Sequence, residues 1–214
     1  MFPDSSKQNK ALLVNLDKSN TKFSISELPD SEIWNEFKEG NEGAFNHIYL
    51  TYFQDLYKYG QQFTTDLNLV QDLIQDLFIY IRKNRTTLGD TRSIKFYLFK
   101  AFRRDILRFF KRNKLIYSGR VESFCNFRLE SSHEVRILQR QLDSQKKDAL
   151  EHAFFKLTKR QKEAIYYHFY QSMSYQEVAM IMDLRNVKSA RNLIYKSIDS
   201  MKAHVNPIKK YLFF

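Results

Sequence analysis

The chain of 214 residues is 43% apolar and 15% aromatic, which is enough to build folded cores and argues against disorder throughout. Its 35 Lys and Arg against 24 Asp and Glu give a formal net charge of +11, which favours a polyanionic partner, nucleic acid or a membrane surface, over no such partner. A single cysteine, Cys125, excludes an internal disulfide and fits a reducing cytoplasm. The polar N-terminus and the lack of any apolar stretch of about 20 residues argue against a signal peptide and membrane insertion.

The placement of proline and glycine predicts an all-α protein. Between Pro29 and Pro207 the chain lacks the residue most hostile to a helix interior, and its glycines fall between apolar-periodic segments. The predicted architecture is two small helical domains joined by a flexible linker. In chain order its parts are an N-terminal extension (1–30), a first helical block (31–114), a linker (115–131), a second helical block (132–205) and a C-terminal tail (206–214).

Residues 66–83 predict an amphipathic helix with an acidic outer face. The expected buried stripe is Leu67, Val70, Leu73, Ile74, Leu77 and Ile81. The opposite face holds Asp72, Gln75, Asp76 and Ile79. Because carboxylates repel phosphates and an exposed isoleucine offers an apolar anchor, this face favours docking to a protein. The alternative is a solvated face with one stray isoleucine.

A polar loop follows at residues 84–93 and includes Asn84, Arg85, Thr86 and Asp90. Its hydroxyl and amide groups suit the Watson–Crick edge of a base that has been pulled out of a duplex. A plain surface loop is the alternative for most of these residues.

Residues 94–112 predict a helix with an aromatic inner side and a basic outer side. The inner side carries Leu98, Phe102, Ile106 and Phe109. The outer side carries Lys100, Arg104, Arg108 and Lys111 beside Tyr97, and Arg103 and Arg112 add to the basic run. Cationic groups for the backbone and a ring for an unstacked base suit single-stranded nucleic acid. A membrane-surface helix is disfavoured because the long inner side chains are typical of a core.

In the last third, three capping-box pairs mark helix starts: Ser131 with Glu134, Thr158 with Gln161, and Ser174 with Glu177. The helix after Ser174 is followed by a turn at residues 183–185 and by a second helix that Asn186 caps. We expect Val187, Ala190, Ile194, Ile198 and Met201 to face inward. The outward residues suit phosphates and base edges in a major groove: Arg185, Asn186, Lys188, Ser189, Arg191, Asn192, Tyr195 and Lys196. A plain helical hairpin is the alternative to a helix-turn-helix.

Together these features resemble the extracytoplasmic-function sigma factors, particularly the subgroup common in Bacteroidetes. Residues 72–78 (DLIQDLF) are similar to the region 2 helix that clamps the largest polymerase subunit, and residues 97–112 to the helix that opens DNA and reads the minus-ten element. Residues 157–161, 174–179 and 187–195 are similar to region 4, which reads the minus-thirty-five element. The chain departs from the family at Tyr97, where many members have Trp, and at Arg104, where many have Asn.

The resemblance implies a sigma factor that binds core RNA polymerase, through its largest and second-largest subunits, and both double- and single-stranded promoter DNA. It assigns polymerase docking to the acidic face, minus-ten contacts to the polar loop and basic helix, and minus-thirty-five contacts to the outward residues of the second domain. It implies no catalysis, cofactor or metal, and an anti-sigma factor as inhibitor. A further hypothesis, motivated by the departures at Tyr97 and Arg104, is an accessory targeting protein that is bound to DNA or guided by RNA.

Two other function classes remain as alternatives. A stand-alone helix-turn-helix regulator would bind DNA without polymerase. An enzyme is disfavoured because the histidines are scattered and no phosphate-binding, zinc-protease or serine-hydrolase motif is present; the histidines are His47, His133, His152, His168 and His204.

Overall fold

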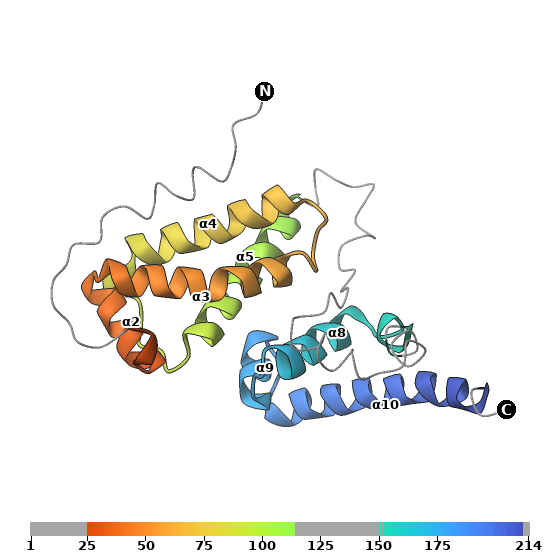
Figure 1. The fold of residues 1–214 in the computed structure, drawn as a ribbon. Helices are drawn as coiled ribbons and strands as arrows, with labels where there is room; N and C mark the ends of the chain where they lie inside the picture. Colours follow the sequence, from red (N-terminus) through yellow and green to blue (C-terminus); the bar gives the residue numbers. More distant parts are fainter. Residues whose placement is uncertain (1–24, 114–149, 151, 212–214) are drawn as a thin grey trace.

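A computed structural model describes residues 25–113, 150 and 152–211, and for residues 205–211 only the helical backbone. Every regular element within these residues is helical, which confirms the predicted all-α fold (Figure 1). The predicted linker, the first part of the second block up to residue 149, and the Ser131–Glu134 capping box lie outside the described residues.

The first block is a bundle of four α-helices with two short 3₁₀ turns. Its elements are η1 (Ile25–Glu27), α2 (Asp30–Glu39), α3 (Glu42–Gly60), α4 (Leu67–Lys83), η2 (Arg85–Thr87) and α5 (Ile94–Asn113). Gly40 ends α2 in the left-handed region at φ 98°, and the Asn41 side chain accepts hydrogen bonds from the first turn of α3. The turn η1 falls inside the predicted N-terminal extension, yet Ile25 packs against the core, so the folded block begins earlier than expected.

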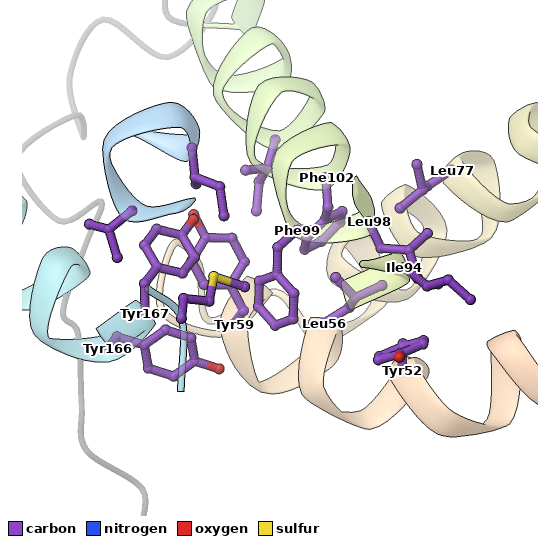
Figure 2. Close-up of a cluster of buried hydrophobic side chains, with 14 of the residues drawn as sticks. Tyr52, Leu56, Tyr59, Leu77, Ile94, Leu98, Phe99, Phe102, Tyr166 and Tyr167 are labelled. Atoms are coloured by element: carbon purple, nitrogen blue, oxygen red, sulfur yellow. The ribbon is translucent and has the colours of Figure 1, made fainter. Parts of the chain in front are cut away.

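A close approach of three helices at Gly60 sets the packing of this block. A Cβ atom at Gly60 would lie 2.4 Å from Val70 Cγ1 and 3.2 Å from Phe102 Cζ. Glycine therefore lets the end of α3 contact α4 and α5 directly. Val70 and Phe102 are fully buried there, and Figure 2 shows Phe102 in one buried cluster with Leu56 and Leu98.

The second block contains α8 (Lys159–Ile165), a π-helical turn η4 (Tyr166–Tyr170), α9 (Tyr175–Ile181) and α10 (Val187–Tyr211). The capping boxes Thr158–Gln161 and Ser174–Glu177 are confirmed, because in each the side chain and backbone hydrogen bonds are both present. Helix α10 continues through Pro207 to Tyr211, beyond the predicted end of the block at residue 205.

The two blocks pack directly against each other and share one buried cluster. The ring of Tyr59 of α3 stacks on that of Tyr166 of η4, with centroids 5.7 Å apart, and packs in a tilted arrangement on that of Tyr167, with centroids 5.4 Å apart. Figure 2 shows these rings side by side, with Phe99 of α5 next to them. The sequence predicted two joined domains but not this contact between them.

Candidate nucleic-acid and protein interfaces

Helix α4 presents the predicted acidic face to solvent. Asp72, Gln75 and Asp76 are exposed, and Ile79 is 49% exposed among them. Tyr80, which was not among the predicted residues, is 53% exposed beside Ile79 and enlarges the apolar part of the face. The surface is therefore acidic with an apolar centre, as a protein-docking face requires.

The inner face of α4 agrees with the prediction except at one position. Val70, Ile74, Leu77 and Ile81 are buried and Leu73 is half-buried, as predicted. Leu67 was predicted to be buried but is 46% exposed, because it is the first residue of the helix, directly after the Asp66 cap. Phe78 is buried instead, with its ring 4.9 Å from that of Tyr49.

Residues 84–93 form an ordered loop stabilised by local hydrogen bonds. The Asn84 side chain donates to the Tyr80 carbonyl at 2.8 Å, and the Thr87 hydroxyl donates to the Asn84 carbonyl at 2.9 Å. Arg85 is half-buried beside Gly40, whereas Thr86 is exposed. Thr86 is therefore the most accessible predicted site residue in the 3₁₀ turn of the loop.

The second half of the loop is held from α2. The Trp34 indole N–H donates to the Gly89 carbonyl at 3.0 Å, and the ammonium of Lys38 pairs with the carboxylate of Asp90. Asp90 remains 87% exposed in this ion pair. The loop is thus fixed on one side and open to solvent on the other.

Helix α5 carries the predicted basic face. Leu98, Phe102 and Ile106 are buried and Phe109 is half-buried. The exposed residues on the outer side are Lys100, Arg104, Arg108, Lys111 and Arg112. Asp105 lies 3.4 Å from Arg104 and 3.6 Å from Arg108, but both arginines stay more than half exposed, so this side remains cationic.

Tyr97 lies where the loop meets α5. Its ring centroid is 4.7 Å from that of Trp34, and burial raises the pKa of Tyr97 above its ordinary value. The ring is half-buried, so one part packs on Trp34 while another part reaches solvent. A base that stacks there would meet a ring whose position is already set.

Arg103 occupies a different environment from the other predicted contacts. Its Nε donates to Glu163 Oε1 at 2.7 Å, its Nη1 lies 3.5 Å from Asp183 Oδ2, and its side chain is only 16% exposed. Burial opposes the charge, but the hydrogen bond and charge of Glu163 outweigh it and raise the pKa of Arg103. In this arrangement the guanidinium is bound to the second block.

Glu163 is the centre of a polar cluster between the blocks. The Tyr59 hydroxyl donates to Glu163 Oε1 at 2.8 Å, and the Tyr167 hydroxyl donates to Tyr59 Oη at 2.5 Å. Burial first, and then the charge of Glu163, raises the pKa of both tyrosines well above the ordinary value, so both are neutral donors at neutral pH. This cluster was not predicted, because Tyr59 and Arg103 lie 104 and 60 residues from Glu163 and one sequence does not reveal such pairing.

Helices α9 and α10 are joined by a short turn of the predicted kind. Asp183 adopts the left-handed region at φ 51°, and Asn186 Oδ1 accepts from the Ser189 backbone N–H at 2.9 Å. Ser189 also donates its hydroxyl to Asn186, so it stabilises the helix start and is half-buried. Val187 was predicted to face inward but is 40% exposed, because it is the first residue of α10.

The outer face of α10 is open and basic. The other predicted contact residues are all exposed: Arg185, Asn186, Lys188, Arg191, Asn192, Tyr195 and Lys196. The guanidinium of Arg191 lies 5.3 Å above the ring of Tyr175 on α9. This contact holds one cation of the face in a defined place.

Within the described ranges, no group of three or more His, Cys, Asp or Glu residues is placed to hold a metal ion. His168 and His204 each contact a backbone carbonyl in their own neighbourhood. None of the helices in the same ranges is both long and apolar enough to cross a membrane.

The fold is similar to that of a known structure. The structure of CnrH in complex with the cytosolic domain of CnrY matches with a TM-score of 0.54 and 17% sequence identity, over 83% of this chain and 97% of the matched chain. At this identity the likeness is one of fold. No protein-family model matches the sequence, and no curated protein matches it either.

Proposed function

We propose that the chain is a sigma factor of the extracytoplasmic-function type, which binds core RNA polymerase and directs promoter recognition, DNA opening and transcription initiation. CnrH is such a factor, and the shared fold supports the assignment. The observation that carries the proposal is the arrangement of charge on this fold. One acidic surface with an apolar centre, on α4, accompanies two basic surfaces on α5 and α10 in a chain of net charge +11.

The acidic face of α4 is the proposed polymerase-docking surface. Asp72, Gln75 and Asp76 surround Ile79, which a protein partner can desolvate while the carboxylates pair with its cations. DNA is disfavoured as the occupant because its phosphates would meet these carboxylates. The largest polymerase subunit is the proposed contact here, with the second-largest subunit also in the complex.

The loop 84–93 and the outer side of α5 are the proposed minus-ten surface. The exposed cations follow the DNA backbone, and Tyr97 with the loop receives an unstacked base. The outer face of α10, entered through the turn at Asp183, is the proposed minus-thirty-five surface of a helix-turn-helix. No bond is made or broken by the protein, and DNA opening uses binding energy alone.

Arg103 links these surfaces to the contact between the blocks. Its guanidinium is bound by Glu163, so it can reach DNA only after the two blocks separate. We propose that binding to polymerase and promoter separates them, and that the linker then allows both blocks to bind at once. The packed arrangement is the form in which the minus-ten surface lacks one of its cations.

An inhibitor is proposed on the basis of the similar structure. CnrH is seen in complex with the cytosolic domain of CnrY, and an anti-sigma factor of this kind is the proposed negative regulator of this chain. We also propose that the factor belongs to the Bacteroidetes-like subgroup, acts in the cytoplasm and is directed by an accessory targeting protein.

Co-elution with core RNA polymerase on a sizing column, followed by in vitro transcription, tests the proposal. The full chain should form a stable complex and support promoter-dependent RNA synthesis. Asp72→Arg with Asp76→Arg should abolish both activities. The control is Glu32→Arg with Glu39→Arg, which makes the same change in net charge at exposed positions of α2 and should retain them.

The stand-alone regulator predicts a different outcome of the same experiment. It would bind DNA through α10 and would keep its activity after charge reversal on α4. A wild-type chain that never co-elutes with polymerase at low salt would reject the sigma-factor proposal.

A further inference from the structure

One face of α2 contacts the predicted base-binding loop at three points. Asp30, Trp34 and Lys38 are spaced four residues apart, so they lie on the same side of the helix. Asp30 Oδ2 accepts from the Ile94 backbone N–H at 2.8 Å, the Trp34 indole N–H donates to the Gly89 carbonyl, and Lys38 pairs with Asp90. All three partners lie within the short segment of residues 89–94.

Each contact fixes a different part of the loop. The Asp30 carboxylate satisfies a backbone donor at the start of α5, which otherwise lacks a partner within its own helix. The Trp34 side chain is fully buried against Tyr97, but its N–H points to the loop backbone. Lys38 pairs with the exposed Asp90. Because an exposed ion pair contributes little free energy, this contact mainly restricts the direction of the loop relative to α2.

Core packing alone does not explain these residues. A phenylalanine at position 34 would fill much of the same space but would leave the Gly89 carbonyl without its donor. Asp30 and Lys38 are polar and contact residues 64 and 52 positions away, which core packing does not require. All three contacts converge on the segment 89–94, directly before Tyr97.

We propose that α2 is a positioning helix, in which Asp30, Trp34 and Lys38 hold residues 88–97 in the shape that accepts an extruded base. The inference rests on the proposed function, because it assumes that this loop reads single-stranded DNA. The three residues touch no base themselves. They act through the Gly89 backbone, Asp90, the start of α5 and the ring of Tyr97.

Backbone hydrogen exchange tests the positioning step without DNA. Trp34→Phe, Asp30→Ala and Lys38→Glu should each speed exchange of the amides at residues 89–94, while amides in α10 should be unchanged. For Trp34→Phe the loss of one hydrogen bond predicts roughly a threefold to tenfold faster exchange. Asp30→Asn keeps the hydrogen-bond acceptor and Lys38→Arg keeps the positive charge. Both variants should therefore show the same protection of the amides at residues 89–94 against exchange as the wild-type chain.

Trp34 is the only tryptophan of the chain, so its emission reports this contact directly. Lys38→Glu should shift the emission to longer wavelength because water gains access to the indole. Two control variants should have the same emission spectrum as the wild-type chain. They are Lys38→Arg, which keeps the charge, and Glu32→Ala, which changes an exposed position of the same helix.

Selection from a degenerate single-stranded DNA library tests the functional step. The wild-type chain in complex with core polymerase should enrich a sequence, and Trp34→Phe should enrich it more weakly while its binding to duplex DNA stays the same. Equal enrichment by both, or unchanged exchange at residues 89–94, would overturn the positioning role. A wild-type complex that enriches no sequence, with exchange altered as expected, would instead reject base reading by the loop and thus the proposed function of this surface.

Discussion

The two basic helices differ in how much of their charged face is available. On α10 the outward cations Lys188, Arg191 and Lys196 are exposed, and Arg191 is held by a ring of its own block. On α5 most cations are exposed as well, but Arg103 is bound by Glu163 and is only 16% exposed. In the packed arrangement the protein therefore has one complete basic surface and one that lacks a cation.

This difference indicates an order of events. The α10 surface can attract duplex DNA in the packed form, because long-range attraction to phosphates needs only exposed charge. The α5 surface becomes complete only when the contact with α8 is broken. For the proposed function this order means that strand opening follows capture of the duplex, because the proposed single-strand surface is completed last.

Removal of the α10 cations should have the largest effect. Lys188→Ala, Arg191→Ala and Lys196→Ala together should weaken duplex binding on the order of 100-fold, at about 1 kcal/mol per charged contact. Each lost phosphate contact should also lower the slope of log affinity against log salt by about 0.9. Binding titrations at several salt concentrations measure both quantities.

The control for this variant removes the same charge elsewhere. Lys58→Ala, Lys83→Ala and Lys156→Ala are exposed lysines outside the α10 face and should leave the slope nearly unchanged. Equal slopes for the two triple variants would mean that α10 is not the duplex-binding surface.

Glu163→Gln should release Arg103. The loss of a charged hydrogen-bond acceptor is expected to weaken the contact between the blocks by about 2 kcal/mol. X-ray scattering should then show a larger radius of gyration, and single-stranded DNA should bind several times more tightly. Asp183→Asn is the matched control and should change neither quantity. Asp183 faces the same guanidinium, but its side chain is 83% exposed, so this ion pair contributes little to the contact between the blocks.

The buried tyrosines predict that alkaline pH opens the same contact. Because the pKa of Tyr59 and of Tyr167 is raised in the packed form, the stability they contribute is fully present below pH 10 and is lost as the pH rises through the elevated values. Tyr59→Phe should cost about 1 kcal/mol at neutral pH through the lost hydrogen bond to Glu163. In one alkaline titration the scattering should change together with the last phenolates to form, and a chain that stays compact after all 13 tyrosines have ionised would contradict this expectation.

The sequence predicted local structure well and contacts between distant segments poorly. Capping pairs such as Ser174 with Glu177, and the inward residues of α4 and α5, follow from helical spacing. Leu67 and Val187 were wrong for one reason: each is the first residue of its helix, where a periodic pattern does not bury the side chain. Periodicity shows which side of a helix is buried but not which other helix packs against that side.

The candidate sites show the same division. The exposed cations of α5 and α10 were identified because the side of a helix is readable from spacing. The bonds from Trp34 to Gly89 and from Arg103 to Glu163 join residues 55 and 60 positions apart, which spacing does not encode. The available cations could thus be predicted, whereas the one that is bound by the other block could not.

The smallest expected effect comes from a single carboxylate on α5. Asp105 lies within 3.6 Å of both Arg104 and Arg108, but exposed pairs contribute at most about 1 kcal/mol. Asp105→Asn should therefore tighten single-stranded DNA binding less than about fivefold and leave the block contact intact. Asp199→Asn makes the same change in net charge on α10. If Asp199→Asn strengthened single-stranded binding equally, net charge rather than the α5 surface would govern it, and the distinction between the two helices would fail.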